Sequence, residues 1–415
     1  MNRPLRFCMI TTFYPPYNFG GDGIFVYRLS NELAKQGHHV EVVHCQDAYL
    51  LLADKPPSPA PQHHPNVVVH GLKSPFGFLS PLATQQTGYP IFKASRLRKI
   101  LNAGFDVINY HNVSLVGGPG VLQYGDAIKL YTLHEFWLVC PTHVLFKNNE
   151  SACERPACFT CNLVYRRPPP LWRYTSLMKS AVRHVDAFIS PDRHTISKHR
   201  EFGLELPMVH LPHFVPAGEE TAVENRPEYA DLRGKPYFLF VGRLERIKGL
   251  QTLIPLFKRW SGARLLIAGT GGYGDDLRRA AEGCDNIQFL GYQSGDRLDA
   301  LYRNAVAVVV PSINYEVAPP LVIMEAFLRR TPAIVRELGS MPESIEDSGG
   351  GFVYRSDEDL LESMRRLLDD TILRDELGAR GYTAYQTQWT TDAYLERYLG
   401  LIGRLAQAKR TGRTA

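Results

Sequence analysis

Short apolar runs alternate with amphipathic segments along most of the chain. Runs such as "FCMI" and "AVAVVV" have the length and the β-branched content of buried strands. Between them, apolar residues recur with helical periodicity, most clearly in 24–37, 274–282, 294–303 and 320–329, and Gly37 follows the first of these as a C-terminal cap. Strands that alternate with helices predict parallel sheets covered by helices, which is an α/β fold.

The predicted strands fall into two series. The first series is "LRFCMIT", "HHVEVVH", "PNVVVHG", "DVINYHN", "AIKLYTL", "DAFIS" and "PMVHLP", and the second is "YFLFVG", "ARLLIAG", "NIQFLG", "AVAVVVPS", "TPAIV" and "GGFVY". Residues 216–235 between them are polar and aperiodic, and we interpret them as a linker. Two doubly wound, Rossmann-like parallel-sheet domains are therefore predicted, at 1–215 and 236–390. An amphipathic helix with a basic tail, 391–415, is expected to pack back on the first domain.

Composition places few further limits on function. The chain has 47 Lys and Arg against 42 Asp and Glu, a net charge of +5. This excess is too small to indicate nucleic-acid binding, and it fits small anionic ligands or weak attraction to an anionic membrane. The apolar run "RFCMITTFY" is short and leads into Pro15 and Pro16, so it indicates a strand and not a signal peptide. We expect a cytoplasmic protein, with peripheral contact at the inner face of the membrane left open.

Residues 241–249, "VGRLERIKG", place Arg243 and Lys248 where a buried strand ends and a helix should begin. In an open parallel sheet, ligands bind beyond the carboxyl ends of the strands, near helix N-termini that already attract anions. A guanidinium can fork onto phosphate oxygens, and an ammonium adds a mobile charge. The alternative is a solvated loop whose cations pair with Glu245.

The segment "YEVAPPLVIMEAF" (315–327) carries two carboxylates. Glu325 interrupts the apolar positions of a helix start, where a carboxylate needs partners, and the vicinal hydroxyls of a ribose are suitable donors. Its alternative partner is Arg329, one turn later in the same helix. Glu316, in the preceding loop, is placed to accept from further hydroxyls.

A glycine-rich loop with Gly20 and Gly21 lies between the first strand and the first helix. Such a loop presents free N–H groups that can hold an anion. Its spacing matches neither the G-x-G-x-x-G fingerprint nor a Walker loop, so it is not typical of a nicotinamide site or of a P-loop nucleoside triphosphatase.

In their order and spacing, these motifs resemble the retaining glycosyltransferases of family 4, which are group 1 glycosyltransferases of the GT-B fold. The resemblance covers nearly the whole chain. Beyond the glycine-rich loop it includes "GRLERIKG", "LLIAGTGGYGDDLRR", "NIQFLGYQSGDRLDALYRNAVAVVVPS" and "YEVAPPLVIMEAF". It implies two Rossmann-like domains facing a central cleft, the first binding an acceptor and the second a nucleotide sugar.

The resemblance also implies roles for single residues. Arg243 and Lys248 match the cations that hold the donor diphosphate, Glu325 the glutamate that binds the ribose, and Glu316 the glutamate that contacts the donor sugar. Tyr292 belongs to a loop near the base. The implied catalytic residues are His134, Glu316, Arg243 and Lys248, and the implied donor-binding residues are Gly20, Gly21, Arg243, Lys248, Gly269, Tyr292 and Glu325. One departure is that eight residues separate Glu316 from Glu325, one more than in the family pattern.

His134 ends the strand-like segment "LYTLH", where the family has a histidine that faces the donor sugar. A hydrogen-bonded structural histidine is the alternative. His111 stands at the end of another strand and has a weaker claim to such a role.

Four of the seven cysteines form the pattern C-x12-C-x4-C-x2-C, namely Cys140, Cys153, Cys158 and Cys161. Four cysteines in a loop without hydrophobic periodicity can supply a tetrahedral structural zinc site. Unligated thiols are the alternative, with an iron–sulfur cluster as a third reading, and a reducing cytosol disfavours disulfides. A metal here would order the loop of residues 140–161 and take no part in the transfer.

Two stretches, 91–105 and 165–184, combine basic with apolar residues and can touch an anionic membrane. For the first, we favour an apolar face that covers the sheet of its own domain. For the second, which contains Trp172 and Tyr174, both interpretations stay open.

The predicted function is transfer of a sugar, with retention, from a nucleoside diphosphate sugar to a saccharide or lipid-linked acceptor in cell-envelope polysaccharide or glycoconjugate biosynthesis. No catalytic metal is implied, because the one D-x-D sequence, "DED" (357–359), opens a late helix. A nucleotide-sugar epimerase or hydrolase on the same fold and a non-catalytic family member are the alternatives. No nucleic-acid partner is expected.

Overall fold

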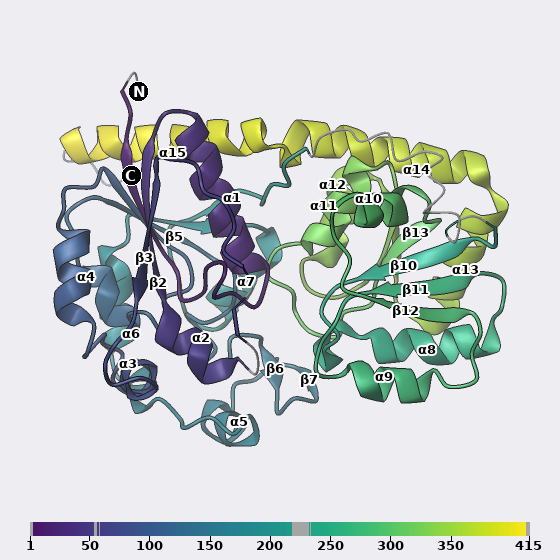
Figure 1. Cartoon of the computed structure of the whole chain (residues 1–415), viewed down its shortest axis with the longest axis horizontal. Helices are drawn as coiled ribbons and strands as arrows, with labels where there is room; N and C mark the ends of the chain where they lie inside the picture. The colour runs from purple at the N-terminus through teal and green to yellow at the C-terminus, as the bar shows by residue number, and fades with distance from the viewer. Residues whose placement is uncertain (1–2, 54–55, 58, 218–231, 233, 412–415) are drawn as a thin grey trace. The chain divides into compact units, whose positions relative to one another are not determined.

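The computed structural model describes residues 3–411 apart from 54–55, 58, 218–231 and 233 (Figure 1). The chain divides into two compact units. Unit 1 comprises Met1–Leu211 with Tyr394–Ala415, and unit 2 comprises Pro212–Ala393. Most of the predicted linker, 216–235, lies outside the described residues.

Unit 1 is built on a parallel sheet with the strand order β3-β2-β1-β4-β5-β8-β9. The strands are β1 (Arg6–Ile10), β2 (His39–Cys45), β3 (Val67–Leu72), β4 (Val107–Tyr110), β5 (Ile128–Thr132), β8 (Ala187–Ser190) and β9 (Met208–His210). Phe7 in β1 pairs with Val40 on one side and Val107 on the other. The strand order therefore reverses at β1 and β4, and such a switch point is where open α/β sheets bind ligands.

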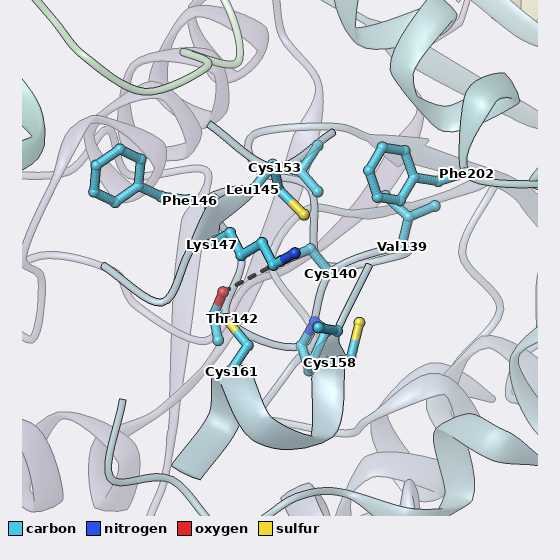
Figure 2. A pocket seen from close by; sticks show the side chains of 12 residues that line it. Val139, Cys140, Thr142, Leu145, Phe146, Lys147, Cys153, Cys158, Cys161 and Phe202 are labelled. Atoms are coloured by element: carbon cyan, nitrogen blue, oxygen red, sulfur yellow. Dashed lines mark hydrogen bonds between the residues drawn. The ribbon is translucent and has the colours of Figure 1, made fainter. Parts of the chain in front are cut away.

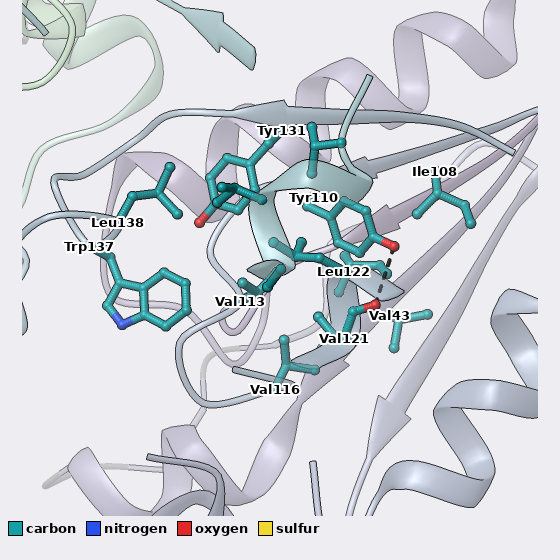
Figure 3. Close-up of a cluster of buried hydrophobic side chains, with 14 of the residues drawn as sticks. Val43, Ile108, Tyr110, Val113, Val116, Val121, Leu122, Tyr131, Trp137 and Leu138 are labelled. Atoms are coloured by element: carbon teal, nitrogen blue, oxygen red, sulfur yellow. Dashed lines mark hydrogen bonds between the residues drawn. The ribbon is translucent and has the colours of Figure 1, made fainter. Parts of the chain in front are cut away.

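The helices of unit 1 follow the strands as the sequence predicts. They are α1 (Gly21–Lys35), α2 (Gln46–Leu52), α3 (Leu79–Thr87), α4 (Ala94–Leu101), α5 (Cys158–Val164), α6 (Leu177–Ala181) and α7 (Arg193–Glu201), with the C-terminal part of α15 (Thr391–Thr411). Helix α4 turns Leu97 and Leu101 into the core, as favoured for its apolar face. Figure 3 shows part of this core, where the Tyr110 hydroxyl donates to the carbonyl oxygen of Val121 over 3.4 Å.

The last helix joins unit 1 through its aromatic side chains. Tyr398 is fully buried, and its hydroxyl accepts a 3.0 Å hydrogen bond from the amide of Asn109 in β4. The Tyr394 ring packs edge-on against Phe25 of α1. Towards the end of α15, Lys409 pairs with Asp186 at 2.7 Å. The helix is therefore part of the core of unit 1.

Unit 2 has a second parallel sheet, in the order β12-β11-β10-β13-β14-β15. Its strands are β10 (Tyr237–Val241), β11 (Arg264–Ala268), β12 (Ile287–Gly291), β13 (Ala307–Val310), β14 (Ala333–Arg336) and β15 (Gly351–Tyr354). Helices α8 (Leu250–Arg259), α9 (Gly274–Ala280) and α13 (Asp357–Asp369) share one apolar cluster, and α10 (Gly295–Arg303), α11 (Leu321–Leu328) and α12 (Met341–Ser348) share another. Helix α14 (Thr371–Ala384) follows α13. The two clusters cover opposite faces of the sheet (Figure 1), so the fold is the predicted pair of Rossmann-like, doubly wound domains.

Each predicted strand is present, and the main difference is a helix boundary. The helix predicted to begin at residue 24 begins at Gly21, because extended Gly20 forms its N-terminal cap and Asp22 its first acidic residue. The glycine-rich loop therefore runs directly into the first helical turn. Across the described residues, no helix is both long and apolar enough to span a bilayer.

Candidate functional site

The predicted donor-binding residues of unit 2 follow the carboxyl ends of adjacent strands. Arg243 and Lys248 follow β10, Gly269 follows β11, Tyr292 follows β12, and Glu316 follows β13. Because β10 lies between β11 and β13, these positions gather at the switch point of the second sheet. We call this edge of the sheet, from the end of β12 to the start of α11, the donor edge.

Lys248 and Glu316 meet at the donor edge although 68 positions separate them in sequence. The Lys248 ammonium donates to Glu316 Oε1 over 2.7 Å, and the Ser312 hydroxyl donates to the same oxygen over 2.7 Å. The side chains are 27% and 13% exposed, so the pair is sheltered but reachable from solvent. A cation held at this point can exchange its carboxylate partner for a phosphate.

Arg243 forms its ion pair with Glu245, with a separation of 2.5 Å between Nη2 and Oε1. The pairing foreseen as the alternative is thus present. With 51% of the arginine side chain exposed, the pair holds the guanidinium only weakly in water. Arg243 therefore remains available to an anion at the donor edge.

At two positions of the donor edge, close backbone contacts leave no room for a side chain and so require glycine. Gly249 has φ +75°, and a Cβ there would lie 1.8 Å from the carbonyl oxygen of Pro311. A Cβ on Gly269 would lie 1.8 Å from the carbonyl oxygen of Gly242. Only glycine fits at these two positions, so the loops after β10, β11 and β13 can pack against one another.

Glu325 lies on α11, where its Oε2 accepts a 2.8 Å hydrogen bond from the hydroxyl of Tyr302. Arg329, foreseen as its alternative partner, forms an ion pair with Asp299 at 2.6 Å. The guanidinium also donates to the backbone oxygen of Glu325 over 3.0 Å. These contacts fix the second half of α11 and orient the Glu325 carboxylate on a helix that begins beside the donor edge.

The extra residue between the two glutamates is accommodated by backbone conformation. Ala318 has φ +64°, a left-handed conformation that few non-glycine residues adopt. The Ser340 hydroxyl donates to the backbone oxygen of Glu316 over 2.9 Å and anchors the loop. Glu316 therefore reaches Lys248 in spite of the altered spacing. Tyr292 is 75% exposed at the end of β12, where a flat ring is open to stacking.

His134 belongs to unit 1, at the end of β5, and its Nε2 lies 2.9 Å from Nδ1 of His111 at the end of β4. The two rings stack with centroids 5.1 Å apart, and the Phe25 ring packs on His134 at 5.2 Å. His111 is fully buried and His134 is half-buried. The structural alternative for His134 is thus realised in part, because it has a fixed partner.

Three polar residues that sequence reasoning did not single out lie near the glycine-rich loop. Burial raises the pKa of Asp22 to about 6, and the charge of Glu135 adds to this, while hydrogen bonds from the Gly23 N–H and the Asn112 side chain oppose it. Glu135 follows His134 and lies 2.6 Å from Nδ1 of His143. Carboxyl groups with raised pKa values are typical of functional sites. The sequence signal of Asn112 and Glu135 was a polar residue directly after each strand-end histidine, and that of Asp22 was an acidic residue within the glycine-rich loop.

Cys140, Cys153, Cys158 and Cys161 line one small pocket of unit 1 (Figure 2). All four are free thiols. Within the described ranges, no group of three or more His, Cys, Asp or Glu is placed so that it could hold a metal ion. The structure therefore brings the four predicted ligands together around one space without closing them into a tetrahedron.

Comparison with known proteins identifies both units. Residues 19–219 match the model of the family Glycosyltransferase Family 4, and residues 223–384 match the model of Glycosyl transferases group 1. Over 145 residues the chain is 36% identical to an uncharacterised glycosyltransferase of Methanocaldococcus jannaschii, covering 33% of this chain and 37% of that protein. Over 409 residues it is 22% identical to the O-antigen chain mannosyltransferase C of Escherichia coli, covering 96% and 98%.

Solved structures share the fold over nearly the full length. Sucrose-phosphate synthase of Thermosynechococcus elongatus superposes with a TM-score of 0.73 at 20% identity, covering 97% of this chain and all of that one. A protein of Anabaena, HepE, crystallised in complex with UDP, gives a TM-score of 0.68 at 15% identity, covering 96% and 100%. The chain spans 37%, 29% and 62% of the lengths of the first curated relatives that it matches.

Proposed function

This chain belongs to the group 1 glycosyltransferases, whose two Rossmann-like domains make up the GT-B fold, and from this premise we propose that it transfers a sugar from a nucleoside diphosphate sugar. The proposed acceptor is a saccharide or a lipid-linked saccharide, and the transfer retains the configuration at the anomeric carbon, as in family 4. The observation that carries the proposal is the Lys248–Glu316 ion pair at the switch point of unit 2. Cell-envelope polysaccharide or glycoconjugate synthesis is the proposed setting, since one relative is an O-antigen mannosyltransferase.

In this mechanism the donor diphosphate takes the place of the acidic partners of Lys248 and Arg243. Each charge-assisted hydrogen bond from these cations contributes on the order of 1.5–3 kcal/mol. The bond between the anomeric carbon and the diphosphate oxygen breaks, and the acceptor oxygen bonds to that carbon on the same face. The acceptor proton passes to the departing phosphate. Both cations stabilise the negative charge that grows on the leaving group.

The other donor-edge residues orient the donor. Glu325, held by Tyr302, accepts from the ribose hydroxyls. Glu316, released from Lys248, accepts from hydroxyls of the transferred sugar. Tyr292 stacks on the base, and Gly269 allows the backbone to approach the diphosphate.

The strand-end residues of unit 1 are assigned to the acceptor and the donor sugar. His134, positioned by His111, faces the donor sugar, and Gly20 and Gly21 provide the open start of α1. Asp22 and Glu135 add carboxyl groups that can accept from acceptor hydroxyls.

We propose that the transfer proceeds without a catalytic metal. The "DED" sequence forms the first turn of α13, where the Ser356 hydroxyl accepts from the Asp359 N–H and Asp357 lies 3.6 Å from Arg259. These carboxylates thus serve a helix start, and Arg243 and Lys248 supply the positive charge. Activity should persist after chelation, with protein-bound zinc measured separately so that unfolding of the cysteine loop is not mistaken for loss of a catalytic ion.

The decisive experiment pairs a donor screen with a matched lysine substitution. Native mass spectrometry against a panel of nucleotide sugars identifies the donor. Lys248→Ala should then lower turnover by at least tenfold, since 1.4 kcal/mol corresponds to a factor of about ten, while leaving the melting temperature nearly unchanged. Lys258→Ala, an exposed residue of α8, is the control.

Three outcomes would contradict the proposal. Full turnover by Lys248→Ala would remove this residue from the mechanism. Rapid donor consumption without acceptor would favour an epimerase or hydrolase, and failure to bind any nucleoside diphosphate would favour a non-catalytic member.

A peripheral contact with an anionic membrane also belongs to this proposal. In unit 1, the rings of Phe76 and Phe92 contact each other at a tilt, with centroids 4.4 Å apart, and the side chains are 52% and 42% exposed. Ile91, which precedes Phe92 in sequence, is 51% exposed. Exposed Arg96 and Lys99 follow on α4. Aromatic side chains next to basic ones are typical of surfaces that lie on anionic leaflets.

Of the second stretch, 165–184, Trp172 is buried, whereas Tyr174 is 62% exposed.

Sedimentation with anionic vesicles tests the membrane contact. Phe76→Ser/Phe92→Ser should bind several-fold more weakly than the wild type, and Ile372→Ser, an equally apolar exposed site in unit 2, should not. Equal binding by all three proteins, or none to any vesicle, would refute a membrane contact at this face.

A further inference from the structure

The loop that carries the four cysteines has little regular structure to hold it. It contains a hairpin of two-residue strands, β6 (Phe146–Lys147) and β7 (Ser151–Ala152), and the seven-residue α5. Cys140 precedes the hairpin, Cys153 follows it, and Cys158 and Cys161 lie one turn apart on α5. All four line the same pocket (Figure 2).

The backbone of this loop is strained. Five non-glycine residues with positive φ lie between residues 143 and 166, with φ from 45° at Leu145 to 78° at His143; the others are Asn148, Asn149 and Arg166. Asparagine adopts this conformation readily, and Asn148 and Asn149 form the turn of the hairpin. At Leu145 and Arg166 the conformation costs on the order of 1–3 kcal/mol and persists only where the surroundings impose it. Because the four thiols form no disulfide, the loop lacks a covalent cross-link that would impose this geometry.

A cation beside the thiols lacks a matching anion. Arg173 donates to the carbonyl oxygens of Trp137, at 2.5 Å, and Leu138, at 3.5 Å, and its guanidinium lies over the rings of Trp137 and Trp172. Its Nε is buried, and in the part of the chain that the structure describes it has no hydrogen-bond partner and the side chain has no ion pair. Negative charge at Cys140 and Cys158 acts favourably on this guanidinium. The charge of Glu135 also acts favourably on the guanidinium, but the two form no ion pair among the described residues. Four neutral thiols therefore leave this cation, withdrawn from water, without a directly bonded anion.

Four cysteine thiolates bound to one divalent ion would both hold the loop backbone in place and supply negative charge beside Arg173. A Zn²⁺ ion with four cysteinate ligands carries a net charge of −2, which compensates Arg173 and the pocket-lining Lys147. The ion also cross-links both arms of the hairpin to α5. The cavity between the side chains is about 20 Å³, which leaves room for one water-sized guest.

We propose that Cys140, Cys153, Cys158 and Cys161 bind one structural zinc ion. Binding releases the thiol protons to solvent and draws the sulfurs to about 2.3 Å from the metal. The site orders the segment that leads back to Glu135, because the Phe136 N–H donates to the His143 carbonyl oxygen and the Cys140 N–H to that of Phe136. The inference does not depend on the proposed transfer reaction.

The test uses the full-length protein, reduced, reconstituted with excess ZnSO4 and dialysed. Elemental analysis should find about one zinc per chain. Cys158→Ser/Cys161→Ser should lose it, and Cys284→Ser, a cysteine outside the pocket, should retain it. Exchange with Co²⁺ should produce the visible bands of a tetrahedral thiolate complex.

A second measurement addresses Arg173 and needs no activity. In competition with a chelator, Arg173→Met should bind zinc about 10–100-fold more weakly, whereas Arg183→Met, an exposed arginine of the same unit, should match the wild type. Wild-type protein that keeps no zinc, that carries iron instead, or whose double serine variant keeps a full equivalent would overturn the proposal.

Discussion

Asp22 offers a quantitative test of the environment at the start of α1. Its pKa rises from 3.8 to about 6, first because burial disfavours the charged form and then because of the charge of Glu135. In the unfolded chain the carboxyl ionises near its ordinary value. As the pH rises from about 4 to about 6, the unfolded state loses the proton before the folded state does, so the free energy of unfolding of unit 1 falls.

A difference of about two pKa units corresponds to ~3 kcal/mol. We therefore expect Asp22→Asn to unfold with a free energy about 3 kcal/mol above that of the wild type at pH 7.5, and with nearly the same value at pH 4. Glu135→Gln should remove part of the pH dependence, because it removes the neighbouring negative charge. The control is Asp126→Asn, which removes an exposed carboxylate from the same unit.

Urea unfolding at each pH, followed by a brief thiol-labelling pulse at one common pH, isolates unit 1. Cys8 in β1 is fully buried and is labelled only when this unit opens. If Asp22→Asn is less stable than the wild type at pH 7.5, or both lose stability equally between pH 4 and 7, the carboxyl does not titrate as inferred. Higher stability with lower activity would be typical of a residue kept for function.

Two further outcomes concern the donor edge. Tyr302→Phe should raise the KM for the donor about tenfold with little change in kcat, because it removes the hydroxyl that orients Glu325. The control is Tyr237→Phe, which removes a 2.8 Å hydrogen bond from another fully buried tyrosine to a backbone carbonyl and should leave KM unchanged. Equal KM values in the two variants would contradict the role of the Tyr302 hydrogen bond. Gly249→Ala and Gly283→Ala share a φ near +75°, but only the first places a Cβ against a backbone carbonyl. Gly283→Ala should therefore destabilise unit 2 by about 1 kcal/mol and Gly249→Ala by clearly more, measured by hydrogen exchange of β10 and β11 in urea, and equal losses would exclude the close contact.

Local sequence determined much of the fold and part of the site. Strand positions follow from apolar runs, and the ends of those runs predicted where ligand-binding side chains stand, since parallel strands present their carboxyl ends at one edge. Arg243, Lys248 and Glu316 could be placed at that edge for this reason. Their pairing, and the left-handed Ala318 that carries the extra residue of the loop, could not, because residues far apart in sequence set both.

Asp22 is a second case in which the sequence alone could not predict the environment of a residue. In sequence it is an ordinary acidic residue in the first turn of a helix, which the helix dipole favours. Its pKa is raised first by burial and then by the charge of Glu135, from the loop after β5, and the folded chain alone creates both conditions. Periodicity along the chain thus settles which segments are strands and helices, because hydrogen bonding and side-chain direction are local. Which charges meet, which thiols share a pocket and which histidines stack depend on strand order, and only the folded chain decides these, because those contacts join residues that the sequence keeps apart.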